Sequence, residues 1–176
     1  MKTLVVYFSY TGNNEALAIF IHRKLACNIF KITEVRKRRP ITMLIELLFK
    51  GLPKISPANF GLDQYAHVIF IAPVWNGKIA TPLKSFLVKE KTEIASYSFI
   101  TICSGRPEQN DWVRNELTEI VGKGPVCITE LMASDVLPDK SNKTNHHRLE
   151  CSDLEIFNGM IDQYLREITE EQNISV

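Results

Sequence analysis

The stretch Ser9-Tyr10-Thr11-Gly12-Asn13-Asn14 decides the fold, together with the apolar residues just before it. Thr3 to Phe8 is a short run rich in β-branched and aromatic residues, typical of a strand buried on both faces of a parallel sheet. After the stretch, apolar residues recur at the spacing of a helical stripe, at Leu17, Phe20, Ile21 and Leu25. The sequence therefore predicts a strand, a tight polar turn and the N-terminus of a helix.

This turn is predicted to bind an anion. Backbone N–H groups and the helix dipole at a helix N-terminus both face whatever lies in the turn. Ser9, Thr11 and Asn14 can add side-chain donors, and Gly12 can adopt a backbone conformation that other residues rarely reach. The predicted ligand group is a phosphate. The alternative is that these hydroxyl and amide residues are ordinary N-caps that bind nothing.

The composition is that of an ordinary globular domain. The chain has 176 residues, 45% of them hydrophobic and 23% charged, with a formal net charge of +1. This charge gives no reason to expect nucleic acid, and no stretch has the length of a membrane span. Four cysteines are scattered without a CxxC pair, which favours reduced thiols. We expect a single cytoplasmic domain over residues 1–176, with neither nucleic acid nor membrane as a partner.

Strand and helix patterns alternate along the rest of the chain. Further strands are predicted at 28–33, 68–72, 99–103 and 126–131, and further helices at 41–50, 81–91, 108–121 and 153–169. Five repeats of strand then helix predict an α/β fold, a doubly wound parallel sheet of five strands between two helical layers. Ligands of such sheets bind at the carboxyl ends of the strands, where the strand order reverses.

Two motifs resemble the flavodoxin-like superfamily. Ser9 to Asn14 resembles its flavin-phosphate loop, S/T-x-T-G-x-T, with Asn14 where threonine or serine is common. Pro73-Val74-Trp75-Asn76-Gly77-Lys78, followed by Thr81-Pro82-Leu83-Lys84-Ser85-Phe86-Leu87, resembles the second flavin loop and its helix in flavodoxins and FMN-dependent flavin reductases. The resemblance covers the chain in element order. It implies the strand order 2-1-3-4-5 and bound flavin mononucleotide (FMN), and the Asn14 amide can still donate to a phosphate.

The resemblance also assigns residues to the flavin ring. Trp75 is the candidate for a wall that stacks on the ring, the alternative being a core residue at a strand end. Asn76-Gly77 can form a turn with positive backbone angles, and the resemblance places this peptide beside the reactive ring nitrogen. Cys103, Ser104 and Gly105 are expected along the pyrimidine edge, with backbone N–H groups toward the ring oxygens. Cys103 itself is interpreted as an inert thiol.

Two classes of function remain open. The first is a redox flavoprotein, either an electron carrier that docks to a redox partner protein or an NAD(P)H-dependent reductase of quinone-like acceptors. Carrier flavodoxins tend to be strongly acidic, and this chain is nearly neutral, which favours the reductase modestly. The second is an interaction or regulatory module that keeps the fold without tightly bound flavin.

Three further features have uncertain roles. Arg36-Lys37-Arg38-Arg39 is a solvated loop, or a docking site for an acidic partner or for the 2′-phosphate of NADPH. The predicted helix at 41–50 is apolar nearly all round, so its second face is expected in a homodimer contact or over the flavin. His146-His147 lacks further ligands nearby in sequence, and no metal is expected there.

Overall fold

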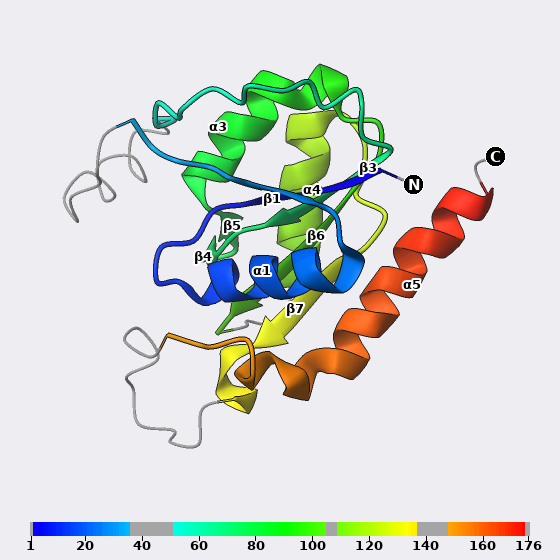
Figure 1. Cartoon of the computed structure of the whole chain (residues 1–176). Coiled ribbons are helices and arrows are strands. Elements are labelled where there is room, and N and C mark those ends of the chain that lie inside the picture. The colour runs from blue at the N-terminus through cyan, green and yellow to red at the C-terminus, as the bar shows by residue number, and fades with distance from the viewer. Residues whose placement is uncertain (1, 36–50, 105–108, 137–147, 175–176) are drawn as a thin grey trace.

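A five-stranded parallel sheet with helices on both faces is the framework of the protein (Figure 1). The computed structural model describes residues 2–35, 51–104, 109–136 and 148–174. The strand order is β2-β1-β3-β6-β7, which is the predicted order 2-1-3-4-5 once a separate two-stranded hairpin is left out of the numbering. The strands of the sheet are β1 Thr3–Tyr7, β2 Asn28–Lys31, β3 His67–Ile71, β6 Tyr97–Cys103 and β7 Ile128–Met132.

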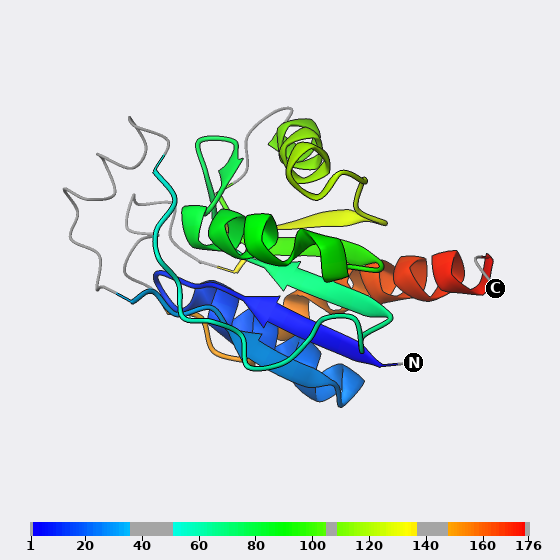
Figure 2. The same cartoon turned by 90° about the horizontal axis from the view of Figure 1, so that it is seen from above.

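Two layers of helices enclose the sheet. Helices α1 and α5 cover one face, and α3 and α4 cover the other (Figure 2). Their bounds are α1 Asn13–Leu25, α3 Thr81–Glu90, α4 Gln109–Val121 and α5 Asn158–Ile174, with short 3₁₀ turns η1 Lys91–Glu93, η2 Ala133–Asp135 and η3 Asp153–Phe157. The predicted helix at 41–50, the basic cluster Arg36 to Arg39 and the pair His146-His147 lie outside the described residues.

The apolar strands divide their side chains between two cores. Leu4 and Val6 of β1 pack on the side of α3 and α4, whereas Val5 and Tyr7 pack on the side of α1 and α5. Every residue of β3 is inaccessible to solvent, because this strand is central and covered on both faces. This double burial explains why the strands appear in the sequence as continuous apolar runs rather than alternating ones.

The last helix differs from its prediction at both ends. The predicted segment 153–169 begins as the 3₁₀ turn η3 and continues as α5 to Ile174. Its apolar stripe is confirmed, because five of its members are buried, namely Leu154, Phe157, Ile161, Tyr164 and Ile168. Tyr164 also closes a buried polar chain, since its hydroxyl lies 2.6 Å from Ser98 Oγ, which lies 2.8 Å from His67 Nε2.

A hairpin that the sequence patterns did not predict follows β3. Strands β4 Val74–Trp75 and β5 Lys78–Ile79 pair antiparallel, and Ala80 N–H donates to the Pro73 carbonyl at 3.0 Å. Two-residue strands carry no periodicity, so only the turn between them was visible in the sequence. Within the described part of the chain, none of the helices has the length and apolar character that crossing a membrane requires.

Candidate functional site

The candidate site lies where the chain leaves the carboxyl ends of β1, β3 and β6. Helix α1 starts there, and the β4–β5 hairpin stands on the same side (Figure 1). The strand order reverses at this point, because β1 leads to β2 on one side and the chain returns to β3 on the other. Such a switch point leaves a crevice between the loops of neighbouring strands.

Gly12 forms the entry to α1. Its φ is 103°, and its carbonyl accepts the Ala16 N–H at 2.9 Å, the first bond of the helix. The Ser9 hydroxyl oxygen accepts the Gly12 N–H at 3.0 Å and so closes the loop on itself. Among the described residues no side chain makes a capping hydrogen bond at the start of α1, although the sequence also allowed an N-cap role for the hydroxyl and amide residues here. The first N–H groups of a helix have no partner within it and are directed out of its end.

Asn13 and Asn14 are turned inward. Asn14 is only 4% exposed, and its amide donates to the Ile102 carbonyl at 3.2 Å and accepts the Ile102 N–H at 3.0 Å. Asn13 Oδ1 accepts the N–H of Leu149 at 3.0 Å. The Asn14 side chain therefore ties the loop to β6 instead of donating into the loop, which corrects the donor role predicted for it. Thr11 and Tyr10 are exposed beside the helix N-terminus.

Arg148 is a residue of this site that the sequence patterns missed. Its side chain lies over Gly12, so that a Cβ atom on Gly12 would be 2.8 Å from Arg148 Nε and 3.1 Å from its Cδ. Arg148 is 136 positions from Gly12, and nothing in the local sequence marks it. The loop 9–14 itself contains neither lysine nor arginine, and the fold brings a cation to it from elsewhere in the chain.

Glu15 joins three groups next to this loop. It accepts hydrogen bonds from Lys31 Nζ at 2.6 Å and Tyr7 OH at 2.9 Å, and its other oxygen lies 3.5 Å from Arg148 Nη2. The hydrogen bond from Lys31 lowers the pKa of Glu15, although burial acts in the opposite direction. The hydrogen bond from Tyr7 and the positive charges of Lys31 and Arg148 lower it further. Burial first, and then the Glu15 carboxylate, raises the pKa of Tyr7. Glu15 is thus an ionised anchor for the first turn of α1.

The predicted Asn76-Gly77 turn is confirmed. Both residues have positive φ, 51° and 76°, which is the geometry of a tight two-residue hairpin turn. The Trp112 ring from α4 packs on Gly77 so closely that a Cβ there would collide with it. A large aromatic ring therefore packs against the turn.

Two aromatic side chains meet between the loop and the hairpin. Trp75 and Tyr10 contact edge to face, with centroids 6.3 Å apart and planes at 88°. Trp75 also contacts Phe8 edge to face at 6.5 Å, and Tyr10 is 54% exposed. Trp75 is half-buried, so its ring packs at the strand end and keeps an accessible part beside the Tyr10 ring. The sequence placed Tyr10 only within the loop 9–14, and its contact with Trp75 was not predicted.

The third predicted segment is described in part. Cys103 ends β6 and is 8% exposed, with its sulfur 3.3 Å from Gln109 Nε2. Ser104 is exposed next to it, and Gly105 lies outside the described residues. The bonds between Asn14 and Ile102 hold this strand end against the start of α1. The structure thus brings the ends of all three loops to one edge of the sheet.

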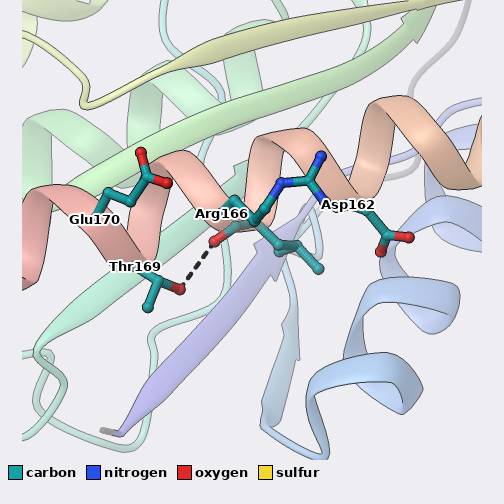
Figure 3. Close-up of a pocket in the computed structure, with 5 residues that line it drawn as sticks. Asp162, Arg166, Thr169 and Glu170 are labelled. Carbon is teal, nitrogen blue, oxygen red and sulfur yellow. Dashed lines mark hydrogen bonds between the residues drawn. The ribbon is translucent and has the colours of Figure 1, made fainter.

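Hollows also occur elsewhere on the described part of the protein. One of about 380 Å³ runs along α5, where the side chains come from a single helix and Thr169 Oγ1 donates to the Leu165 carbonyl (Figure 3). Another, of about 370 Å³, is lined by residues of α1, β1 and β2 that include Tyr7 and Lys31, the partners of Glu15. A larger one, of about 790 Å³, lies between α3 and α4 and borders Asn76, Gly77 and Trp112. The last two touch the candidate site, whereas the hollow along α5 does not. Within the described segments, no group of three or more His, Cys, Asp or Glu residues could hold a metal ion.

Solved structures share this fold. A flavoprotein from Lactobacillus acidophilus in complex with FMN matches with a TM-score of 0.63 at 19% identity, over 73% of this chain and 92% of that one. A putative flavoprotein from Bacteroides uniformis matches with a TM-score of 0.63 at 16% identity, over 82% and 95% of the two chains. A putative flavoprotein from Bacteroides eggerthii matches at 0.62 and 15% identity, over 74% and 87%.

The chain has the flavodoxin-like fold, as its strand order and these structural matches show together. No protein-family model matches the sequence, and a comparison with curated proteins finds no match either. The fold that the two sequence motifs implied is thus confirmed.

Proposed function

We propose that this protein binds FMN at the carboxyl edge of its sheet and moves electrons with it. The observation that carries the proposal is the convergence of three features at one edge. These are the αL glycine at the start of α1, the Trp75–Tyr10 wall, and the Asn76-Gly77 turn. The helix start suits a phosphate, the aromatic wall suits a flat ring, and the exposed peptide of the turn suits the polar edge of that ring.

The residues have distinct roles in this proposal. The N–H groups at the start of α1 receive the phosphate, with Ser9 shaping the loop around Gly12. Trp75 and Tyr10 cover the ring, and the exposed ring of Tyr10 is free to turn aside to admit it. The Asn76-Gly77 peptide and the backbone at Cys103 and Ser104 meet the polar ring edges. Bound FMN would supply reversible electron and hydride transfer.

A flavin titration tests this proposal directly. We expect the purified protein to show oxidised-flavin absorbance, or to retain about one FMN per chain after addition and gel filtration. A protein that retains no flavin would refute the proposal. Adding NADH or NADPH under anaerobic conditions then separates the two redox roles, because a reductase of quinone-like acceptors bleaches rapidly and a carrier does not.

A regulatory or interaction module is the second candidate. The inward-turned Asn14 amide favours it, since the side chain that stands in the place of the family's hydroxyl is used for structure. The double variant Thr11→Val and Gly12→Ala distinguishes the candidates. It releases flavin and abolishes electron transfer under the first proposal, and it leaves partner binding intact under the second.

A further inference from the structure

Arg148 is fixed at its backbone and free at its tip. The next residue, Leu149, donates its N–H to Asn13 Oδ1 at 3.0 Å, and its side chain is 2% exposed within the core under α1 and α5. The Arg148 side chain is 70% exposed. The arginine is therefore carried to the first turn of α1 by a buried neighbour, while its guanidinium remains in solvent.

The glycine at position 12 leaves room for this arginine. The Arg148 atoms Cγ, Cδ and Nε lie within 3.1 Å of the position that a Cβ on Gly12 would occupy. The stem of the side chain thus lies on the Gly12 backbone, directly over the phosphate loop. The guanidinium therefore lies beside the first turn of α1, next to the place where the helix N–H groups would hold an anion.

The bond to Glu15 holds the guanidinium only weakly. The Arg148–Glu15 distance of 3.5 Å is the longest of the three contacts that Glu15 makes, and Lys31 and Tyr7 satisfy the carboxylate without it. Exposed ion pairs contribute little to stability. Arg148 can therefore leave Glu15 for a stronger anion at small cost.

We propose that Arg148 selects the phosphate of the cofactor, by donating from its guanidinium to a phosphate monoester bound at the start of α1. This inference rests on the proposed function, and it adds that the charge for the phosphate comes from a segment far from the loop. Guanidinium and phosphate match in charge and in bidentate hydrogen-bond geometry. The site should consequently prefer FMN over riboflavin, and this preference should weaken as salt is added.

Titration with the two flavins tests the inference. The wild type, Arg148→Ala and Arg148→Lys are titrated with FMN and with riboflavin, at low and at high ionic strength. We expect Arg148→Ala to weaken FMN binding about 10- to 100-fold and to change riboflavin binding less than about twofold. Arg148→Lys keeps the positive charge but loses the two-pronged guanidinium, so its affinity for FMN should lie between those of the wild type and Arg148→Ala.

A matched arginine provides the control. Arg23→Ala removes the same charge from the exposed last turn of α1, at the opposite end of the helix, and should leave both affinities unchanged. Unchanged FMN affinity in Arg148→Ala would overturn the inference and leave the proposed function standing. Equal weakening of FMN and riboflavin would also overturn it, because Arg148 would then only support the loop. A wild type that binds neither flavin would refute the proposed function itself.

Discussion

Asn14 and Ile102 exchange two hydrogen bonds across 88 positions of sequence. The Asn14 amide oxygen accepts the Ile102 N–H at 3.0 Å, and its nitrogen donates to the Ile102 carbonyl at 3.2 Å. The amide thus acts as a further strand residue beside the end of β6. This bridge fixes the loop 9–14 relative to the end of β6, so the geometry of the candidate site depends on one buried side chain.

Removing this bridge should destabilise the protein. Asn14→Ala leaves the Ile102 N–H buried without its partner and leaves the Ile102 carbonyl with only the Thr101 hydroxyl, 3.3 Å away. We expect this to cost about 2–4 kcal/mol in the free energy of unfolding. Urea denaturation measures this loss. Asn28→Ala is the control, because it removes a single bond from an exposed residue to Tyr65 and should cost less than about 1 kcal/mol. Equal effects of the two variants would contradict the structural role of Asn14.

The bridge also shows what the sequence could and could not predict. The order of strands and helices followed from apolar runs and stripes, because burial on two faces of a sheet imposes those patterns on the chain. Gly12 and the Asn76-Gly77 turn could be placed because positive φ restricts residue type. Asn14 was assigned to the correct loop but with its side chain in the wrong role, since its partner lies in another strand.

Arg148 and Trp112 could not be predicted from local patterns at all. Each reaches the site from a distant segment, and each contacts a glycine whose missing side chain makes the room. An exposed arginine in a polar stretch and a tryptophan in the first turn of a helix have no spacing that marks them. Only the packed fold brings them to Gly12 and Gly77.

Substitution of Gly12 should be costly mainly through its backbone conformation, because the exposed Arg148 side chain can move away from an added Cβ. Gly12→Ala forces a φ of 103° on a residue with a Cβ, and that Cβ would lie 2.8 Å from Arg148 Nε. We expect a loss of about 1–3 kcal/mol in the free energy of unfolding and a weaker affinity for FMN. Thermal or urea unfolding measures the loss of stability, and flavin titration measures the loss of affinity for FMN.

Gly159→Ala is the matched control for Gly12. Gly159 lies in α5 with open space around its missing Cβ, so alanine there should be neutral or stabilise the helix by up to about 1 kcal/mol. The double variant Gly12→Ala and Arg148→Ala should recover only the part of the loss that comes from the contact. Full recovery would show that the backbone angle of Gly12 carries no strain.

Acid should destabilise the protein through His67. This side chain is inaccessible between Ser96 and Ser98, and burial lowers its pKa from the ordinary 6.5 to about 4. At a pH between these two pKa values, His67 is protonated in the unfolded chain and neutral in the folded protein. The stabilisation is therefore complete above about pH 6.5 and is lost as the pH falls toward 4, by about 3 kcal/mol.

Urea denaturation across this pH range measures the effect. His67→Gln retains polar atoms for the two serines but does not titrate, so its stability should vary less between pH 7 and pH 4 than that of the wild type. The difference between the two proteins isolates His67 from the carboxylates, including Glu15, whose lowered pKa acts in the same direction. If the free energy of unfolding depended on pH in the same way for both proteins, folding would not lower the pKa of His67, and this prediction would be wrong.

Trp75 should contribute to binding through the ring and not through the phosphate. Trp75→Ala removes the aromatic wall that Tyr10 and Phe8 support, and it should weaken FMN and riboflavin equally, by about tenfold. Arg148→Ala should weaken FMN alone, so the two variants separate the two ends of the ligand. Trp112→Phe keeps an aromatic ring behind Gly77 and serves as the control, with both affinities within about twofold of the wild type. If Trp75→Ala bound both flavins as the wild type does, Trp75 would be a packing residue at the end of its strand and the flavin ring would have to lie elsewhere.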